Sequence, residues 1–185
     1  MKLSRVWSMP NSNTFNIKPI GELIERYGFT EEPLTFLDPF CRNSRYKGFC
    51  ITNDIDPEIE ADYHVDALEF LKMFDDESVH GVLFDPPYSP RQVSECYKKH
   101  DLTVNMQTTQ ASFWSNMKKE ISRITTPSAV CITCGWNSGG IGKKYGFEIE
   151  EVLMVPHGGW HNDTIVTVER KEAIHGLSQT AHNRE

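Results

Sequence analysis

The sequence predicts an α/β domain with a mostly parallel, Rossmann-like, doubly wound sheet and an antiparallel hairpin at its C-terminal end. Between residues 20 and 136, short apolar runs alternate with amphipathic stretches. Such alternation requires crossover connections between parallel strands. After residue 146, two strand-like runs are separated only by the six residues HGGWHN, and so short a link favours a hairpin.

Strands are expected where apolar runs rich in Val, Ile, Phe or Thr stop at polar or turn residues. Four such runs precede the hairpin, at 34–39, 49–54, 79–87 and 128–136. The two arms of the hairpin are expected at 147–156 and 163–171.

Three helices are expected between the strands. The first, 20–28, stops at a glycine, the second, 66–74, opens at an aspartate, and the third covers 111–124. Apolar residues of the third recur at spacings of three and four and form one stripe: Phe113, Trp114, Met117, Ile121 and Ile124. This stripe predicts a helix that packs on the sheet.

The length and composition fit a single domain. We place it at residues 1–171 and expect a polar, frayed tail at 172–185, which lacks periodicity. No apolar run approaches the ~20 residues of a membrane span, and the N-terminus has no signal-peptide core. A cytoplasmic protein without membrane contact is therefore expected.

The cysteines and histidines give little support for a metal site. Five scattered cysteines suggest reduced thiols. Cys131 and Cys134 form a CxxC pattern, but within a strand residues three apart point to opposite faces, so buried thiols are expected. His157 and His161 are attributed to the hairpin turn, and no metal is expected.

The charge of the chain limits its partners. A net charge of −7 argues against a protein that coats nucleic acid by charge alone. The segment between residues 89 and 123 is nevertheless basic, and Arg91, Lys98 and Lys99 are candidate nucleic-acid contacts. A solvated helix face would have the same pattern, so both interpretations stay open.

Four acids stand where predicted strands end or the next helix opens: Asp38, Asp54 (with Asp56 as a rival), Asp66 and Asp85. The carboxyl ends of parallel strands form the ligand crevice of an open α/β sheet, so these acids predict a binding site. Each also has a structural explanation. Asp66 can cap its helix, and the others can form turns.

The pattern of acids and glycines indicates a cofactor without phosphates. An acid that closes the second strand suits the hydroxyl groups of a ribose. The first loop, LDPFCRNS, has no glycine that would let a pyrophosphate approach the backbone, and GGIG at 139–142 follows the wrong strand. S-adenosylmethionine is a nucleoside cofactor of the expected kind.

The residues Asp85, Pro86, Pro87 and Tyr88 predict chemistry on an amine. The exocyclic amine of adenine is a weak nucleophile because its lone pair is delocalised into the ring. The Asp85 carboxylate and the Pro86 carbonyl can accept its two hydrogens and aim that lone pair at a methyl donor, while the prolines restrict the backbone. Tyr88 can stack on a flipped base.

The DPPY residues resemble the catalytic motif of DNA amino-methyltransferases, especially the adenine-N6 enzymes. NTFNIKPI (13–20) is similar to their N-terminal cofactor segment, LDPFCRNS (37–44) to their first cofactor loop, and TNDID (52–56) to the segment with their ribose-binding acid. DALEFL (66–71) is similar to the segment whose acid meets the cofactor's adenine, and GWHNDTIVTVERK (159–171) to the closing hairpin of small phage-type members.

The resemblance implies a class I methyltransferase fold with a seven-stranded sheet, S-adenosylmethionine as cofactor and double-stranded DNA as partner. It further implies a bacterial host and a phage or mobile-element origin. The implied catalytic residues are Asp85, Pro86, Pro87 and Tyr88. The implied cofactor residues are Thr14, Phe15, Asp38, Pro39, Phe40, Asn43, Asp54, Asp66, Ala67 and Asp85.

Two departures from the family pattern bear on function. Cys41, Arg42, Asn43 and Ser44 stand where the family normally has glycines. There is also no separate recognition domain, which leaves 89–112 or a partner chain, including a second copy, to recognise the target. RNA adenine, cytosine N4 and a glutamine amide remain alternative acceptors. A weakly active accessory subunit or an antirestriction module that binds the cofactor is the alternative from another class.

Overall fold

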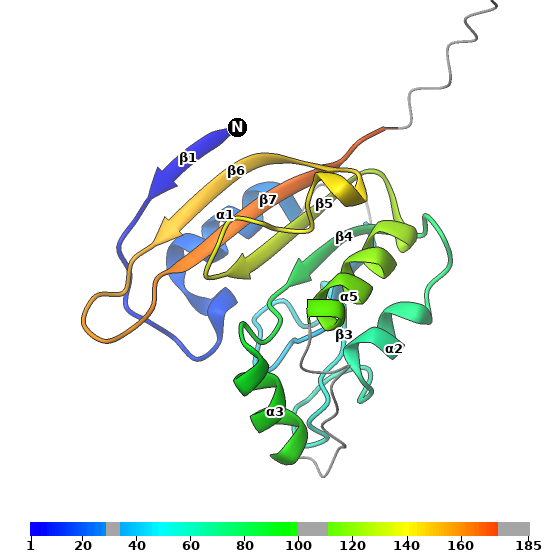
Figure 1. The fold of residues 1–185 in the computed structure, drawn as a ribbon, viewed down its shortest axis with the longest axis horizontal. Helices are drawn as coiled ribbons and strands as arrows, with labels where there is room; N and C mark the ends of the chain where they lie inside the picture. Colours follow the sequence, from blue (N-terminus) through cyan, green and yellow to red (C-terminus); the bar gives the residue numbers. More distant parts are fainter. Residues whose placement is uncertain (29–33, 100–110, 174–185) are drawn as a thin grey trace, which may run out of the picture.

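The computed structural model describes residues 1–28, 34–99 and 111–173 (Figure 1). The predicted tail from residue 174 onward and the part of the 89–112 segment at 100–110 lie outside the described residues. No helix in the described ranges is long and apolar enough to cross a membrane.

The described chain forms one mixed sheet of seven strands in the order β1-β6-β7-β5-β4-β2-β3 (Figure 1). The strands are β1 (Lys2–Arg5), β2 (Phe36–Asp38), β3 (Cys50–Thr52), β4 (Val79–Phe84), β5 (Thr125–Gly135), β6 (Phe147–Val155) and β7 (Thr164–Lys171). Strand β7 is antiparallel to both β5 and β6, and the other neighbours are parallel. The predicted parallel sheet with a C-terminal antiparallel hairpin is confirmed.

The helices fill the connections. They are α1 (Lys18–Gly28), α2 (Ala67–Lys72), α3 (Pro90–Lys99) and α5 (Ala111–Ile124), with 3-10 turns at Thr14–Asn16 and Lys143–Tyr145. The three predicted helices are present. The sequence analysis missed α3 because its polar residues mask its periodicity, and it missed β1 because that short edge strand is exposed and polar.

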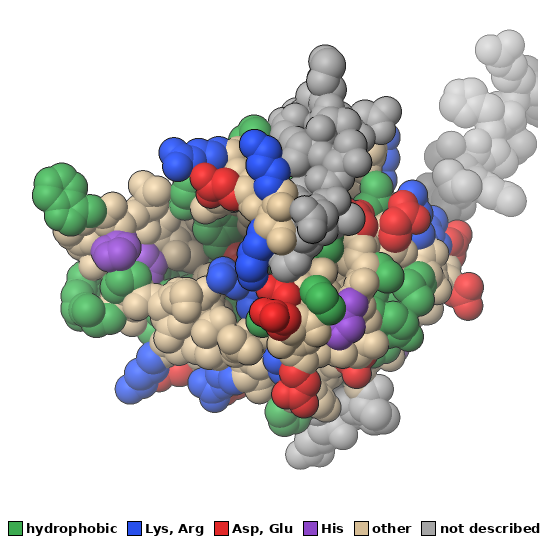
Figure 2. Space-filling model, turned by 90° about the horizontal axis from the view of Figure 1, so that it is seen from below, with side chains coloured by type: hydrophobic (Ala, Val, Ile, Leu, Met, Phe, Trp, Pro, Cys, Tyr) green, Lys and Arg blue, Asp and Glu red, His purple; other side chains and the backbone are tan. Residues whose placement is uncertain are grey.

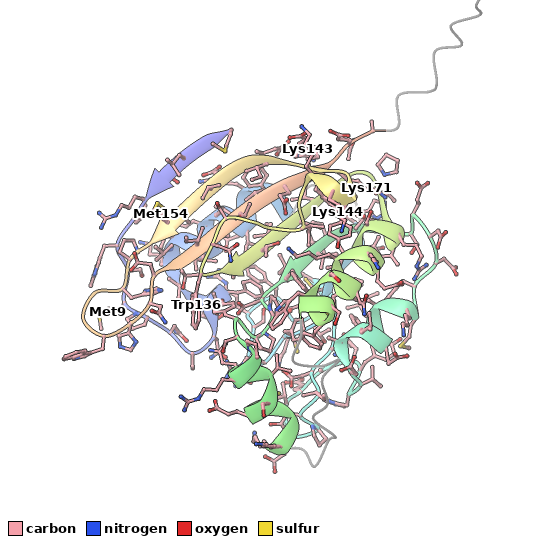
Figure 3. All side chains as sticks on the ribbon, in the orientation of Figure 1. Met9, Trp136, Lys143, Lys144, Met154 and Lys171 are labelled. Carbon is pink, nitrogen blue, oxygen red and sulfur yellow. The ribbon has the colours of Figure 1, made fainter. Side chains whose placement is uncertain are left out.

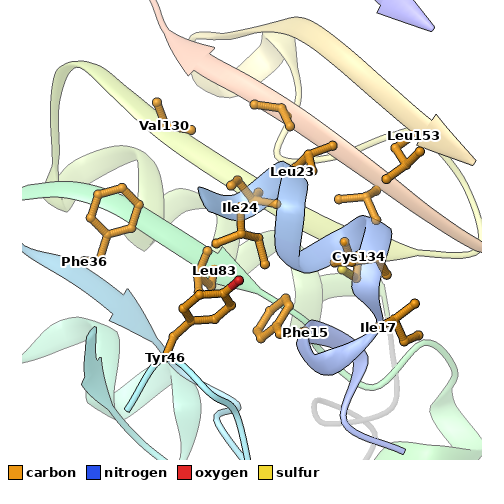
Figure 4. Packing of buried hydrophobic residues seen from close by; sticks show 14 of the residues in the cluster. Phe15, Ile17, Leu23, Ile24, Phe36, Tyr46, Leu83, Val130, Cys134 and Leu153 are labelled. Carbon is orange, nitrogen blue, oxygen red and sulfur yellow. The ribbon is translucent and has the colours of Figure 1, made fainter. Parts of the chain in front are cut away.

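Both faces of the sheet are covered, as in a doubly wound fold. On one face, Leu23 and Ile24 of α1 pack with Leu83 of β4 and Val130 and Cys134 of β5 (Figure 4). On the other face, α2 and α5 pack against residues that include Val82, Phe84 and Cys131. Cys131 and Cys134 thus lie on opposite faces as buried free thiols, as the strand pattern predicts.

Buried charge fixes β1 to the rest of the fold. The Glu151 side chain of β6 is 2% exposed and accepts hydrogen bonds from Arg26 Nη2 at 2.8 Å and Tyr27 OH at 2.9 Å, both from α1. Lys2 of β1 lies 3.2 Å from the same carboxylate. One buried acid therefore joins α1, β1 and β6.

The direction of the strands determines where a site can form. Strands β1, β2, β3, β4, β5 and β6 all run the same way, so their carboxyl ends meet at one edge of the sheet, the lower edge in Figure 1. The segments that follow these ends form the loops of that edge, and a ligand crevice is expected there.

We expect Gly81→Ala to destabilise the fold. A Cβ at Gly81 in β4 would lie 2.2 Å from a ring carbon of Phe36 in the neighbouring β2, so the ring must move within a packed core. Overpacking of this kind costs about 1–3 kcal/mol. Urea unfolding measures the loss. The matched control is Gly28→Ala, whose added Cβ would make only ordinary contacts of 3.6 Å or more. Equal stability of the two variants would contradict the prediction.

Candidate active site

A cavity of about 520 Å³ opens at the carboxyl ends of β2, β3 and β4, and its size is typical of small-molecule sites. It is lined by Thr14, Pro39, Phe40, Arg42, Asn53, Asp54, Ile55, Asp56, Ile59, Asp66, Ala67, Asp85, Pro86, Pro87, Tyr88, Gln92, Glu95, Cys96, Lys99 and Phe113. Figure 2 looks at this edge and shows acidic and basic side chains gathered around a hollow.

Asp85 and Tyr88 form a direct pair at the end of β4. The Tyr88 hydroxyl donates a hydrogen bond to Asp85 Oδ1. Burial raises the pKa of both groups, because each charged form loses contact with water, and the neighbouring Thr14 side chain acts in the opposite direction. The Tyr88 ring also packs edge-on against Trp136, with 5.6 Å between ring centroids. Tyr88 is therefore held at both its hydroxyl and its ring.

The turn between Asp85 and Tyr88 is fixed by α5 and α3. Trp114 Nε1 donates to the Pro87 carbonyl at 3.0 Å, and the backbone N–H of Tyr88 donates to Gln92 Oε1 at 2.7 Å. Among the described residues no hydrogen bond reaches the Pro86 carbonyl. The turn thus leaves that carbonyl as an available acceptor beside the Asp85 carboxylate.

Two consecutive residues after β3 tie the neighbouring loops together. Buried Asn53 donates through Nδ2 to the Pro39 and Val65 carbonyls, at 3.1 and 3.0 Å, and accepts from the backbone N–H of Val65 at 3.1 Å. Asp54 accepts from the backbone N–H groups of Arg42 and Asp56, each at 2.9 Å. Asp54 therefore lines the cavity and anchors the loops at the same time.

Asp66 and Asp56 also line the cavity and at the same time stabilise the local structure. Asp66 Oδ1 accepts from the Leu68 N–H at 2.9 Å and caps α2, and Asp66 lines the cavity as well. Asp56 lies 2.7 Å from Lys99 Nζ, which joins α3 to the loop after β3. Helix capping and a place in the cavity wall coexist at Asp66.

Asp38 lies behind the cavity wall rather than in it. Its side chain is fully buried; Oδ1 accepts from the Phe40 N–H at 3.3 Å, and Oδ2 has no partner among the described residues. Burial raises its pKa to about 8, and the nearby charges of Asp85 and Asp54 act in the same direction. A neutral carboxyl group at pH 7 accounts for a buried acid that forms no ion pair with the described residues.

The first loop adopts a backbone conformation that normally favours glycine. Arg42 has φ +44° and is one of three non-glycine residues with positive φ in the described chain. Its side chain is exposed and lines the cavity, and its backbone N–H is held by Asp54. The loop thus keeps a left-handed turn although it contains no glycine.

The structure brings many of the predicted residues to the cavity. Its wall includes Thr14, Pro39, Phe40, Asp54, Asp66, Ala67, Asp85, Pro86, Pro87, Tyr88 and Lys99. Phe15 instead packs in the core, and Asn43, Arg91 and Lys98 are exposed outside the cavity wall. Arg91 pairs with Glu95 at 2.7 Å.

Several wall residues were not predicted: Arg42, Asn53, Ile55, Ile59, Gln92, Glu95, Cys96 and Phe113. Phe113 belongs to the apolar stripe of α5, but periodicity alone does not separate a core residue from a cavity residue. Gln92, Glu95 and Cys96 belong to α3, which was itself missed. The position of Asn53 directly before Asp54 is the one local signal for the loop residues.

A second hollow, of about 390 Å³, lies at the opposite end of the sheet. Its wall includes Lys119, Lys144 and Lys171, and Figure 3 shows Lys144 and Lys171 far from Trp136. Lys171 Nζ donates to the Ser122 and Thr125 carbonyls at the end of α5, so it has a structural role. None of the predicted site residues lines this hollow.

The histidine of the hairpin link has protein partners. His157 is buried, with Nδ1 2.9 Å from the Ser8 carbonyl and Nε2 2.9 Å from Thr164 Oγ1. His161 is exposed. No group of three or more potential metal-binding side chains occurs in the part of the chain that the structure describes.

Comparison with known proteins identifies the fold. The chain matches no protein-family profile and no curated protein sequence. It is similar to the solved structure of TrmN from Thermus thermophilus, with TM-score 0.56 and 14% identity over 84% of this chain, and it spans about half of TrmN (49%).

Two further solved structures have the same fold. A SAM-dependent methyltransferase from Methanosarcina mazei matches with TM-score 0.51 and 14% identity, over 81% of this chain and 97% of that one. A Burkholderia thailandensis N1-methyltransferase of 1,6-didemethyltoxoflavin, with S-adenosylhomocysteine bound, matches with TM-score 0.51 and 12% identity, over 77% of this chain and 72% of that one. The fold is that of class I S-adenosylmethionine-dependent methyltransferases.

We expect Asp38→Asn to flatten the pH dependence of stability. The pKa of Asp38 is raised from 3.8 to about 8 in the folded chain, so between these values the folded state holds a proton that the unfolded chain has released. Its contribution to stability is complete below pH ~4 and is lost as the pH rises through ~8. The free energy of unfolding should therefore fall less between pH 5 and pH 8 in Asp38→Asn than in the wild type.

Urea unfolding at the two pH values measures this difference. The control is Asp62→Asn, because hydrogen bonds from Thr52 lower the pKa of Asp62 below 3.8 and leave it ionised across the whole interval. An unchanged pH 5 to pH 8 difference in Asp38→Asn would contradict a neutral Asp38.

Proposed function

We propose that this protein is an S-adenosylmethionine-dependent methyltransferase that methylates the N6 amine of adenine in DNA. The observation that carries the proposal is the Asp85-Pro86-Pro87-Tyr88 turn at the mouth of the cavity. It offers two hydrogen-bond acceptors close to the aromatic ring of Tyr88. One is the Asp85 carboxylate, which the Tyr88 hydroxyl contacts, and the other is the Pro86 carbonyl, which has no hydrogen-bond donor in the described chain. The methyltransferase fold supports the cofactor assignment.

The cavity wall suits S-adenosylmethionine, which supplies an electrophilic methyl group on its sulfonium. Asp54 and Asp66 are acceptors for ribose hydroxyls and for the adenine of the cofactor, and Phe40, Ile55 and Phe113 provide apolar surface for that ring. The acids along the wall also favour a ligand with positive charge. Of the residues that the family resemblance implies, Phe15 and Asn43 do not contact the cofactor in this proposal. Phe15 packs in the core, and the Asn43 carbonyl accepts a hydrogen bond from Asn16 Nδ2 at 3.2 Å.

Catalysis in this proposal is an arrangement of hydrogen-bond acceptors. Asp85 and the Pro86 carbonyl accept the two hydrogens of the target amine, which localises its lone pair in the direction of the methyl donor. Trp114 holds the turn through the Pro87 carbonyl, so the Pro86 carbonyl keeps its direction. Tyr88 supports Asp85 through its hydroxyl and offers its ring to the extruded base.

The nucleic-acid surface proposed here centres on α3. Arg91, Lys98 and Lys99 lie on this exposed helix, which borders the cavity. They suit contacts with phosphates of double-stranded DNA, and a second copy or a partner subunit would complete target recognition. As part of the same proposal, the enzyme acts in the cytoplasm of a bacterial host and derives from a phage or mobile element.

We expect Asp85→Ala to lower methyl transfer to DNA by at least about 100-fold, because one of the two acceptors on the amine is lost. The assay follows labelled methyl from S-adenosylmethionine into unmethylated duplex DNA, with nucleoside analysis and parallel RNA and single-stranded DNA. The control is Asp75→Ala, at an exposed acid after α2. Label in N6-methyladenine that disappears only with Asp85→Ala supports the proposal. Full activity of Asp85→Ala, or label only in RNA or in N4-methylcytosine, refutes it.

We expect the ring of Tyr88 to contribute more to DNA binding than its hydroxyl does. Loss of base stacking in Tyr88→Ala should raise KM for DNA about 5- to 150-fold, since stacking of a base on an aromatic side chain contributes about 1–3 kcal/mol. Tyr88→Phe keeps the ring and should change KM by less than about 3-fold on the same grounds. Steady-state kinetics on both variants test this. Equal KM values for the two variants would contradict a stacking role.

A further inference from the structure

Arg42 occupies a position where the backbone favours glycine. Its φ of +44° lies in the left-handed region, which side chains with a Cβ adopt at a cost. The turn is nevertheless fixed, because the Arg42 N–H donates to Asp54 Oδ2 and the Cys41 N–H donates to the Asn53 carbonyl at 3.0 Å. A side chain kept at such a position points to a role for that side chain.

Arg42 lines a cavity whose other charges are mostly negative. Asp54, Asp56, Asp66, Asp85 and Glu95 line the wall, and the two basic residues of the wall are Arg42 and Lys99. Lys99 pairs with Asp56 at 2.7 Å, whereas Arg42 makes no ion pair with any described residue.

The positive charge of Arg42 acts on titratable groups from two elements of the cavity wall. It lowers the pKa of Asp85 at the end of β4 and that of Cys96 on α3, although burial raises both pKa values overall. Arg42 thus shares the cavity wall with Asp85 of the proposed catalytic turn and with Cys96 of α3, and its charge acts on both.

We propose that Arg42 binds the α-carboxylate in the amino-acid part of the cofactor. This inference rests on the proposed function. S-adenosylmethionine carries two positive groups, the sulfonium and the ammonium, and one negative group, the carboxylate. The acidic wall complements the positive groups. The Arg42 guanidinium, which has no ion pair within the described ranges, complements the carboxylate, to which it can donate two parallel hydrogen bonds.

The assignment also explains why this loop works without glycine. In a loop that binds a ligand through backbone N–H groups, a glycine allows the backbone to come close. Here the loop keeps the left-handed turn and adds a cation, so a side-chain contact to the ligand replaces close approach of the backbone. Arg42 is therefore a binding residue for the cofactor and takes no part in the methyl-transfer step.

Calorimetric binding of two ligands to Arg42→Asn tests the proposal. Asparagine tolerates the left-handed region, so the loop is kept while the charge is removed. S-adenosylhomocysteine carries the carboxylate, whereas 5′-methylthioadenosine is the corresponding thioether without the amino-acid part. Arg42→Asn should weaken S-adenosylhomocysteine binding about 10- to 100-fold and change 5′-methylthioadenosine binding by less than about 2-fold, as expected for loss of a charge-assisted pair.

Arg45→Asn is the matched control. Arg45 is an exposed arginine of the same segment, pairs with Glu25 at 2.6 Å and does not line the cavity, so its replacement makes the same charge change without touching the ligand. Both affinities should stay at wild-type values. Arg42→Gly, which suits the left-handed turn best, should weaken S-adenosylhomocysteine binding as much as Arg42→Asn does. Arg42→Lys keeps the positive charge and should weaken that binding less.

The outcomes separate the two proposals. A wild-type protein that binds neither ligand overturns the proposed function, and the role of Arg42 with it. A wild-type protein that binds both ligands while Arg42→Asn binds each normally, or loses both equally, overturns only the role of Arg42. Weakened binding of a duplex oligonucleotide by Arg42→Asn, with S-adenosylhomocysteine binding unchanged, assigns the guanidinium to a phosphate and overturns the carboxylate proposal.

Discussion

The candidate site depends on the hydrogen bonds of two buried neighbours, Asn53 and Asp54. Asn53 joins the loops after β2 and β3 to the segment before α2 through Pro39 and Val65, and Asp54 holds the backbone of Arg42 and Asp56. Backbone hydrogen bonds join the same loops, from the Cys41 N–H to the Asn53 carbonyl at 3.0 Å and from the Asp54 N–H to the Tyr63 carbonyl at 3.1 Å. Together, these side-chain and backbone bonds position the loops that form the wall of the cavity.

Burial then gives the acids of this edge different chemical characters. Asp38 is fully buried, and burial raises its pKa to about 8, so the neutral group is favoured at pH 7. Asp54 and Asp66 line the cavity and accept backbone N–H groups of the loops around it. Burial also raises the pKa of Asp85, while the side chains of Thr14 and Tyr88 and the charge of Arg42 act in the opposite direction. Four acids of one rim can therefore serve one site without equivalent roles.

Sequence patterns of this chain carry more local than global information. With identities of 12–14% to solved methyltransferases, the fold is recognised through topology. The DPPY turn is a local pattern that the sequence alone reveals. The helices α5 and α3, which flank the turn, hold it through Trp114 and Gln92. In the first loop, by contrast, the local pattern is misleading. The absence of glycine suggests an altered turn, but Arg42 adopts the left-handed conformation that glycine favours.

The sequence by itself determined the types of the main elements, the parallel sheet with its hairpin, and the placement of acids at strand ends. These features follow from apolar periodicity and from the handedness of crossovers, both properties of short segments. Only the tertiary structure decided that Asp54, Asp66 and Asp85 open into one cavity while Asp38 and Phe15 do not, that β1 pairs with β6, and that Arg42 lines the cavity. Burial and strand pairing depend on residues far apart in the chain, which periodicity does not report.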